Sequence, residues 1–431
     1  MKGLVDRSFL SALREQPRSW PRCGLADRPA VPYAQNPGNV AGMSQLNIAI
    51  IGAGIAGLTA ARALQGFGFK PVVYEQAPVL GEVGAGLTVS PNATHVLNAI
   101  GLEGALERIG MCPERGGVKH WKTGELLVEI SRGNEMREKY GAAYYQVHRA
   151  DLHRELADLV VTTDEQAIRT NHSFKGLEQD SDGVTLFFEN GHSARADVVI
   201  GADGVRSRVR EQLFGKDTPR FTGYMAFRGL VPFAHLPAGT IEPSSCLSTG
   251  PGRSFTRYLI RGGSLVNFVG LTERDDWREE GWSIRATIKE MLDEYSGWYE
   301  GVRTIIAATP PDGLFKWALF DREPLPEWTR GRVTLIGDAA HPLLPFLGQG
   351  AAMGIEDGMV VARAFAAADS VDEALRRYVE ARLPRANWVM LESRKTALNY
   401  HSGREENFKP GKHVSAESLG LMAYNPAAVP V

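Results

Sequence analysis

The strongest constraint on the fold of this 431-residue sequence is a glycine-rich turn between a predicted strand and a predicted helix. Residues 46–51 are a short apolar run rich in β-branched side chains, which is typical of a strand buried on both faces. The next six residues are GAGIAG, and the Ala- and Leu-rich segment 58–64 predicts a helix directly after them. A second predicted strand, residues 71–75, ends in Glu75, 18 residues after the last glycine.

This order of strand, GxGxxG turn, helix and acidic residue indicates a dinucleotide-binding site. The first glycine allows the tight turn, the second lets a pyrophosphate approach the backbone, and the third lets the helix pack on the strand. The helix N-terminus stabilises phosphate charge, while a carboxylate at the end of the second strand binds the adenosine ribose. The motif alone leaves open whether the dinucleotide is FAD or NAD. The predicted contact residues are Gly52, Ala53, Gly54, Ile55, Ala56, Gly57, Glu75 and Gln76.

Two later segments repeat the pattern of an apolar strand that ends in Gly and Asp. Residues 197–207 contain GADGVRS, and residues 332–342 contain GDAAHP. A single Asp of this kind is most simply a helix cap, but two of them at strand ends lie where open α/β sheets bind ligands. After the second, Gly348 and Gly350 precede a predicted helix whose N-terminus would stabilise negative charge on a reduced flavin.

Composition excludes several other classes of protein. The net charge is −2, so the chain lacks the basic character of a nucleic-acid binder. Three scattered cysteines are too few for a disulfide framework or a CxxC metal site, which predicts a reducing, cytoplasmic location and no bound metal. The longest apolar run, residues 48–61, is shorter than the roughly 18 residues that indicate a membrane span, so we expect no membrane partner.

We predict an α/β fold in which a discontinuous Rossmann-like domain carries an inserted, mostly antiparallel β-sheet domain that binds the substrate. A C-terminal helix, broken near Pro384, and a tail would follow, with a homodimer contact as one candidate role for the tail. The proline-rich N-terminus has no regular period and is predicted to be a disordered extension. The predicted boundaries are 1–43 for the extension, 44–220 and 319–381 for the Rossmann-like domain, 221–318 for the inserted domain, and 382–431 for the C-terminal part.

Four motifs in this order resemble the single-component FAD-dependent aromatic hydroxylases, the group A flavoprotein monooxygenases. They are residues 52–57 with Glu75, VHRADL at 147–152, GADGVRS at 201–207 and GDAAHP at 337–342. The chain is most similar to the salicylate hydroxylase and 3-hydroxybenzoate 6-hydroxylase branch, from about residue 46 to about residue 385. The absence of a second GxGxxG motif and of a CxxC pair argues against a disulfide reductase.

The resemblance implies FAD as the cofactor and NADH or NADPH as co-substrate, with O2 added to the flavin as a C4a-hydroperoxide. That species would hydroxylate a small phenolic or N-heteroaromatic ring that carries a carboxylate. A flavin dehydrogenase or oxidase, or a flavin-bearing regulatory protein, stays open as an alternative. By resemblance, the FAD contacts beyond the first motif are Arg149, Asp203, Gly337, Asp338, Gly348, Gln349, Gly350, Ala351 and Ala352.

The substrate pocket is expected on the predicted strand 221–231. Alternation places Met225 and Phe227 on one face of this strand and Arg228 on the other. Because the family resemblance directs this strand toward the substrate, we predict Met225, Phe227 and the loop residue Pro345 as pocket residues, although a strand aromatic is more often core. Arg228 is predicted to form a structural ion pair.

No catalytic base is identified from the sequence. Thr88 stands where the hydroxynicotinate hydroxylases have a histidine. His341 lies beside the predicted flavin loop, but it can equally be a packed structural side chain.

Overall fold

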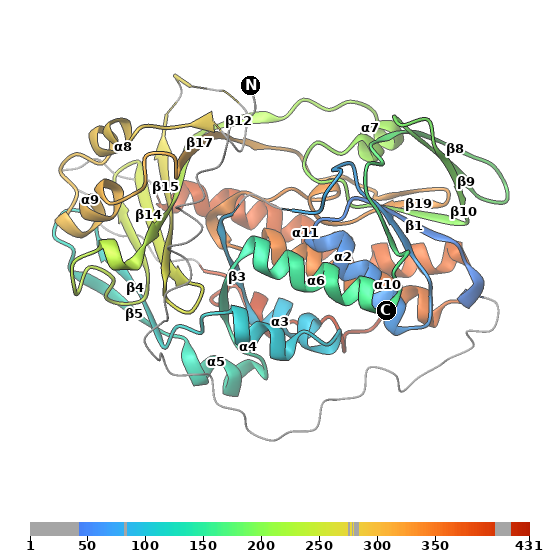
Figure 1. Ribbon diagram of the computed structural model, residues 1–431, viewed down its shortest axis with the longest axis horizontal. Coiled ribbons are helices and arrows are strands. Elements are labelled where there is room, and N and C mark those ends of the chain that lie inside the picture. The colour runs from blue at the N-terminus through green and yellow to red at the C-terminus, as the bar shows by residue number, and fades with distance from the viewer. Residues whose placement is uncertain (1–42, 82–83, 275, 278, 280–283, 401–414) are drawn as a thin grey trace.

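The computed structural model describes residues 43–81, 84–274, 276–277, 279, 284–400 and 415–431. Residues 1–42 of the predicted N-terminal extension lie outside these ranges. The described chain forms two main sheets, each with helices packed beside it (Figure 1).

The first sheet confirms the predicted Rossmann-like core. Its strand order is β18-β19-β11-β1-β2-β7, and every pair is parallel except the edge pair β18–β19. Helix α2 packs against both α6 and α10, in a layer below the sheet (Figure 1). The bounds are β1 Ile48–Ile51, β2 Val72–Tyr74, β7 Ile168–Arg169, β11 Val198–Gly201, β18 Thr329–Arg330, β19 Val333–Leu335, α2 Ile55–Gly66, α6 Arg149–Thr163 and α10 Gly350–Ala367.

The second sheet has eight strands in the order β16-β17-β12-β15-β14-β13-β4-β5, and all its pairs are antiparallel except β13–β4. This confirms the mostly antiparallel sheet. Strands β4 and β5 come from the segment that the predicted boundaries assign to the Rossmann-like domain. The bounds are β4 Arg115–His120, β5 Leu126–Ser131, β12 Arg220–Pro232, β13 Ser245–Gly250, β14 Arg253–Ile260, β15 Leu265–Glu273, β16 Ile284–Arg285 and β17 Leu314–Asp321.

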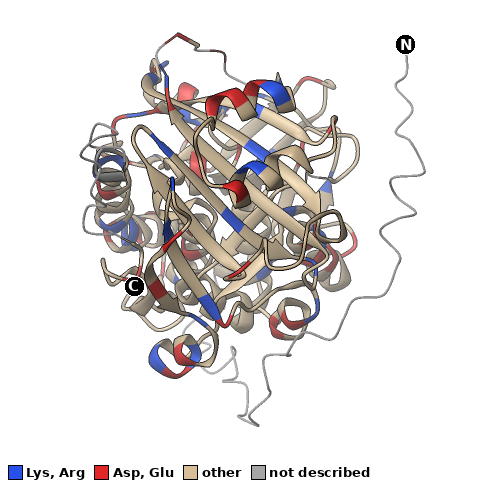
Figure 2. Cartoon of the chain, turned by 90° about the vertical axis from the view of Figure 1, so that its left-hand side faces the viewer, with Lys and Arg blue, Asp and Glu red and all other residues tan. Residues whose placement is uncertain are grey.

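Helices α8 (Ile288–Glu294) and α9 (Glu300–Ala307) cover the outer face of this sheet, where an apolar core contains Met225, Phe227 and Phe268. Along the ribbon on this side of the molecule, Lys and Arg positions are interspersed with Asp and Glu positions (Figure 2).

Smaller elements complete the fold. A ribbon of β3 and β6 joins the two main sheets, and β8, β9 and β10 form a separate antiparallel sheet. Their bounds, with the remaining helices, are β3 Gly86–Val89, β6 Tyr145–His148, β8 Phe174–Gln179, β9 Val184–Phe188, β10 Ser193–Ala196, α3 Pro91–Ala99, α4 Glu103–Ile109, α5 Gly133–Tyr140 and α7 Arg208–Phe214.

The C-terminal helix α11 spans Val371–Tyr400 without interruption, so the predicted break near Pro384 is wrong. Pro384 is exposed, and the carbonyl that it leaves without an intrahelical partner can therefore be hydrated. Residues 415–431 fold back, where Leu421 and Met422 are buried in the core of the Rossmann-like part. Within the described residues, no helix is long and apolar enough to cross a membrane.

Candidate functional site

A cavity of about 580 Å³ lies between the two main sheets. Gly54, Ala202 and Gly337, which follow the parallel strands β1, β11 and β19, form one side of it. Leu271 and Trp317 of the antiparallel sheet form another side. The cavity therefore lies at the carboxyl ends of the parallel strands, where α/β sheets bind ligands.

The glycine-rich turn after β1 has the geometry that a pyrophosphate needs. Gly52 has φ +106°, and a Cβ atom there would lie 2.5 Å from the Ala202 carbonyl oxygen. A Cβ atom on Gly57 would lie 2.1 Å from the Gly52 carbonyl oxygen, so both glycines are required by close packing. At Gly54 a Cβ atom would meet nothing within 4 Å, and no side chain caps the N-terminus of α2. The turn therefore leaves open space beside free helix N–H groups.

Glu75 ties the end of β2 to this turn. Its Oε2 accepts a hydrogen bond from the Ala53 backbone N–H at 2.9 Å, and its Oε1 accepts one from Ala77 at 2.9 Å. Neither Glu75 nor its exposed neighbour Gln76 is among the residues that line the cavity. Of the other predicted contacts, Gly54, Ile55 and Ala56 line the cavity, whereas Gly52, Ala53 and Gly57 support the turn from behind.

Arg149 and Asp338 place opposite charges in the cavity. Arg149 is the first residue of α6, and its backbone N–H donates to the Ala85 carbonyl at 2.8 Å. Asp338 is exposed to the cavity but surrounded by protein, which raises the pKa of its carboxyl, while Arg149 and His341 lower it. A carboxylate and a guanidinium in one cavity can orient a ligand that bears hydroxyl and carbonyl groups.

Asp203 does not line the cavity, although its neighbours Ala202 and Gly204 do. Its carboxylate accepts hydrogen bonds from the Ser207 hydroxyl and, at 3.1 Å, from the Val209 backbone N–H. Burial raises the pKa of Asp203, and these hydrogen bonds oppose the increase. The contacts of Asp203 are those of a residue that organises the turn before α7.

The loop before α10 presents backbone to the cavity. Pro345, Gly348, Gln349, Gly350 and Ala351 line it, whereas Ala352 is buried underneath. Gly348 has a left-handed φ of +62°, and α10 begins without a side-chain cap. Its first N–H groups are therefore available to a ligand, in the place where the sequence predicts a flavin contact.

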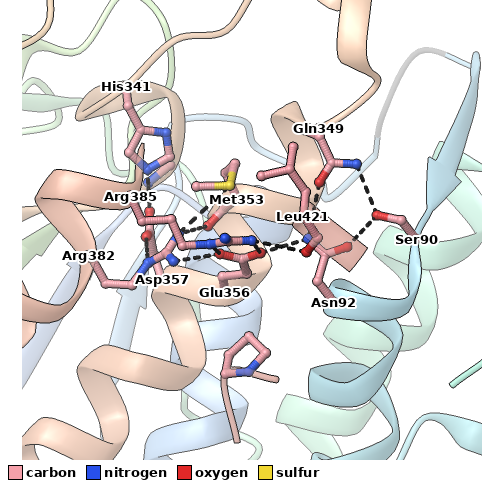
Figure 3. A network of polar contacts seen from close by, with 12 residues as sticks. Ser90, Asn92, His341, Gln349, Met353, Glu356, Asp357, Arg382, Arg385 and Leu421 are labelled. Atoms are coloured by element: carbon pink, nitrogen blue, oxygen red, sulfur yellow. Dashed lines mark hydrogen bonds and ion pairs between the residues drawn. The ribbon is translucent and has the colours of Figure 1, made fainter. Parts of the chain in front are cut away.

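Three buried polar side chains connect this loop to the start of α3, and no sequence motif predicted them (Figure 3). The Ser90 hydroxyl donates to Asn92 Oδ1 at 2.6 Å, and Asn92 Nδ2 donates to Gln349 Oε1 at 3.1 Å. Gln349 Nε2 donates back to the Ser90 oxygen at 3.0 Å. We call Ser90, Asn92 and Gln349 the amide ring, because their side chains form a closed cycle of hydrogen bonds.

A buried charge cluster adjoins the amide ring (Figure 3). Asn92 Nδ2 also donates to Glu356 Oε1 at 2.6 Å, and Glu356 accepts further bonds from Arg382 and Arg385 of α11. Next to it, Asp357 Oδ1 accepts from Arg382 Nε at 2.7 Å. The only sequence signal was an acidic pair within an apolar predicted helix.

The same cluster fixes the second Gly-Asp motif. Asp357 Oδ2 accepts from the Gly337 backbone N–H at 2.8 Å and from His341 Nε2 at 2.5 Å. Burial would raise the pKa of Asp357, but His341 and Arg382 together lower it to about 2. His341 is 0% exposed and lies outside the cavity lining, so its contacts are those of a structural histidine.

The predicted pocket residues on β12 face away from the cavity. Met225 and Phe227 belong to the core between the antiparallel sheet and helices α8 and α9, and neither lines the cavity. Alternation was predicted correctly, but the face that meets the cavity is the one that carries Arg228. The Arg228 guanidinium lies 5.5 Å from the Phe315 ring and 5.6 Å from the Trp317 ring. Burial and the nearby Arg149 lower the pKa of Arg228 to about 10.

Comparisons with known proteins agree with this geometry. A family model described as FAD binding domain matches residues 45–393. The chain is 40% identical over 381 residues to a 3-amino-4-hydroxybenzoate 2-monooxygenase of Streptomyces platensis, covering 88% of this chain and 94% of that protein. It is 38% identical to a 6-hydroxynicotinate 3-monooxygenase of Pseudomonas fluorescens, covering 73% and 81%. A solved substrate complex of salicylate hydroxylase matches with a TM-score of 0.71 at 27% identity, covering 84% of this chain and 92% of that one.

Proposed function

The chain belongs to the FAD binding domain family and, within it, to the flavoprotein aromatic monooxygenases, and from this we propose its reaction. It is an FAD-dependent monooxygenase that uses NADH or NADPH and O2 to hydroxylate a small, carboxylated phenolic or N-heteroaromatic ring. The relatives are named for 3-amino-4-hydroxybenzoate and 6-hydroxynicotinate, rings of this class.

One observation carries the proposal: a single cavity joins the dinucleotide turn to an apolar chamber. Gly54 and Asp338, which follow strands of the parallel sheet, line it together with Val269, Leu271 and Trp317 of the antiparallel sheet. Pockets for small ligands combine apolar walls with a few polar groups that fix orientation. A dinucleotide that binds from the glycine-rich turn to the loop before α10 would thus end beside a space that suits an aromatic ring.

The residues present fit FAD. The open turn at Gly54 and the uncapped α2 would receive the pyrophosphate, and Glu75 would receive the ribose. Arg149, Asp338 and the N-terminus of α10 would hold the flavin half. When bound, FAD would supply the redox chemistry, because it can be reduced by NAD(P)H and can then activate O2 for transfer of one oxygen atom to the ring.

The chain's own contribution at the substrate end is to exclude water and to orient the ring. Leu271, Trp317 and Leu344 are all buried and line the cavity. An apolar wall keeps water from a reactive oxygen donor, which would otherwise be lost as H2O2. Thr88 contacts the loop before α10, because its hydroxyl donates to the Gly348 carbonyl at 3.2 Å.

The proposal also covers the nicotinamide co-substrate, the cellular location of the protein and its oligomeric state. The sequence has no second GxGxxG motif, which favours transient docking of NADH or NADPH without a domain of its own. The small number of cysteines favours a reducing, cytoplasmic location. A homodimer stays a prediction.

The test is a coupled assay on the FAD-loaded protein. NADH or NADPH oxidation, oxygen uptake and hydroxylated product would be measured together for aminohydroxybenzoates, hydroxybenzoates and hydroxynicotinates. We expect stimulation by at least one carboxylated ring and incorporation of one oxygen atom from labelled O2 into the product. Oxidation of a substrate without oxygen incorporation would indicate a dehydrogenase or oxidase, and absence of any stimulation would indicate a binding protein.

A further inference from the structure

A row of polar side chains crosses the cavity away from the loop before α10. Gln146 lies opposite Thr88 in the β3–β6 ladder, and its Nε2 donates to the Ser245 hydroxyl at 2.8 Å. Ser245 in turn lies opposite Tyr258 in the β13–β14 ladder. All of these residues line the cavity, together with Tyr144 and Arg132. We call this set, Thr88, Gln146, Ser245, Tyr258, Tyr144 and Arg132, the polar wall.

Gln146 has an unused acceptor on this wall. The residue is only 1% exposed, and its Oε1 has no hydrogen-bond partner among the described residues. Buried polar atoms are nearly always paired, because an unpaired one loses its hydration without compensation. Since Gln146 lines the cavity, a ring hydroxyl or amine of a bound ligand can donate to this oxygen.

Arg132 carries a positive charge that is only loosely compensated. Its guanidinium lies 4.5 Å from the centre of the Tyr144 ring, and its side chain is 12% exposed. Its ion-pair partner among the described residues is Glu417, whose Oε2 is 4.0 Å from Nη1, beyond hydrogen-bond distance. The other oxygen of Glu417 is shared by Lys139 and Tyr140. A ligand carboxylate would therefore gain a charge-assisted bond to Arg132.

Arg132 and Gln146 are linked along the wall by Tyr144. Arg132 stacks on the Tyr144 ring, and Tyr144 is two residues before Gln146 in the sequence. The Gln146 end is adjacent to Thr88, which contacts the loop before α10.

We propose that the polar wall is the substrate-recognition site, in which Arg132 pairs with the ring carboxylate and Gln146 accepts a bond from a ring hydroxyl or amine. The proposal rests on the proposed function, because it takes its ligand class from that function. It also separates Arg132 from Arg149 and Arg228, two of the other arginines that line the cavity. Arg149 interacts electrostatically with both Arg228 and Asp338, and we assign these three residues to the cofactor.

The experiment measures binding without turnover, from the change in the visible FAD spectrum of the loaded, oxidised protein. The probes are 3-amino-4-hydroxybenzoate, its carboxamide, and benzoate, which lacks both ring donors. We expect the wild-type protein to bind the carboxylate at least about tenfold more tightly than the carboxamide. Arg132→Gln should reduce this preference to about twofold or less, and Arg132→Lys should restore part of it, because the charge returns without the planar fork.

A second variant tests the other end of the wall. Gln146→Met should lose the preference for 3-amino-4-hydroxybenzoate over benzoate and keep the preference for carboxylate over carboxamide. The matched control is Arg115→Gln on the adjacent strand β4, whose side chain is 72% exposed and outside the cavity lining. It should match the wild type in every titration, and equal FAD content in all variants would confirm that they are folded.

The possible outcomes are distinct. A carboxylate preference that survives in Arg132→Gln would overturn the recognition site and leave the proposed function intact. A wild-type protein without any carboxylate preference would show that the proposed substrate class is wrong, and the recognition site with it. Loss of both preferences in both variants would contradict the division of roles between Arg132 and Gln146.

Discussion

Phe227 and Arg228 show how sharply neighbouring residues on one strand can differ in role. Phe227 is 0% exposed and lies in the core with Phe255 and Phe268, whereas Arg228 lines the cavity. Adjacent side chains on a strand point to opposite faces, so each face of β12 has a separate function. A substitution at Phe227 therefore acts on stability, and a substitution on the opposite face acts on the pocket.

We expect Phe227→Ala to lower the free energy of unfolding by about 3–5 kcal/mol, because it leaves a cavity in the core. The product formed per NAD(P)H oxidised should stay at the wild-type value at temperatures where the variant is folded. The contrasting variant is Leu271→Ala on the cavity side, which should release more H2O2 at a smaller cost in stability. Denaturant unfolding and the ratio of product to H2O2 measure both effects. A stable but uncoupled Phe227→Ala protein would contradict the assignment.

At the scale of elements, the N-terminus of α10 is held in place by side chains from α3 and α11. The amide ring joins Gln349 to Ser90 and Asn92, and Glu356 joins that ring to Arg382 and Arg385. Every member is buried or nearly so, which makes the cluster stiff but costly to disturb, since a buried charge without its partner is strongly unfavourable. The loop before α10, which lines the cavity, is thus positioned from behind.

Ser90→Ala tests whether the amide ring positions this loop. The substitution leaves Gln349 Nε2 without its acceptor and should cost about 1–3 kcal/mol, divided between stability and FAD affinity. The matched control is Thr396→Ala on α11, a buried hydroxyl that bonds only the Glu392 carbonyl of its own helix. Fluorescence titration of FAD should show weaker binding for Ser90→Ala and unchanged binding for Thr396→Ala. Equal FAD affinity in the two variants would mean that the ring is structural only.

At the scale of the whole molecule, the C-terminal helix and tail connect the two sheets. Arg382 reaches Asp357 beside the parallel sheet, and Arg394 further along α11 pairs with Asp321 of β17. The tail is bound in turn, because the Leu421 carbonyl accepts from Arg385 and the Tyr424 ring lies 3.9 Å from that guanidinium. Both walls of the cavity therefore depend on one continuous helix.

His148 makes the stability of the folded protein depend on pH. Burial, and then Arg261, lower its pKa from 6.5 to about 4, and the Arg261 guanidinium lies 3.4 Å from its Nδ1. The folded protein thus holds a neutral histidine, whereas the unfolded chain binds a proton below about pH 6.5. The contribution of His148 is complete above pH 6.5 and is lost as the pH falls toward 4.

We expect the unfolding free energy to fall by at most about 1.4 kcal/mol per pH unit for this group between pH 6.5 and 4. His148→Asn should flatten that part of the curve, and the exposed His235→Asn should not change it. His95, whose pKa is also lowered by burial, should leave a residual slope in this range. Asp357, whose pKa is lowered to about 2, should cause a further loss of stability between about pH 4 and 2. An unchanged slope in His148→Asn, measured by denaturant unfolding across this range, would contradict the assignment.

The sequence by itself predicted the half of the site that we propose for the dinucleotide. The glycine turn, Glu75 and the two Gly-Asp strand ends are short contiguous motifs whose function depends on local backbone geometry. Such motifs can be recognised without knowing what packs against them. The parallel sheet, the antiparallel sheet and the family were also predicted correctly, because strand patterns and family motifs are likewise contiguous in the sequence.

Only the tertiary structure decided the substrate half and the supporting cluster. Alternation shows that β12 has two faces, but which face meets the cavity depends on where α8 and α9 pack. The polar wall brings Arg132 and Gln146 together with Tyr258 from a distant strand, and the charge cluster pairs α10 with α11, so neither has a local signature. Pro384 continues α11 because its face is exposed, a fact that sequence position alone does not give. Contacts between segments far apart in the chain are fixed by packing, and packing is decided by the whole fold.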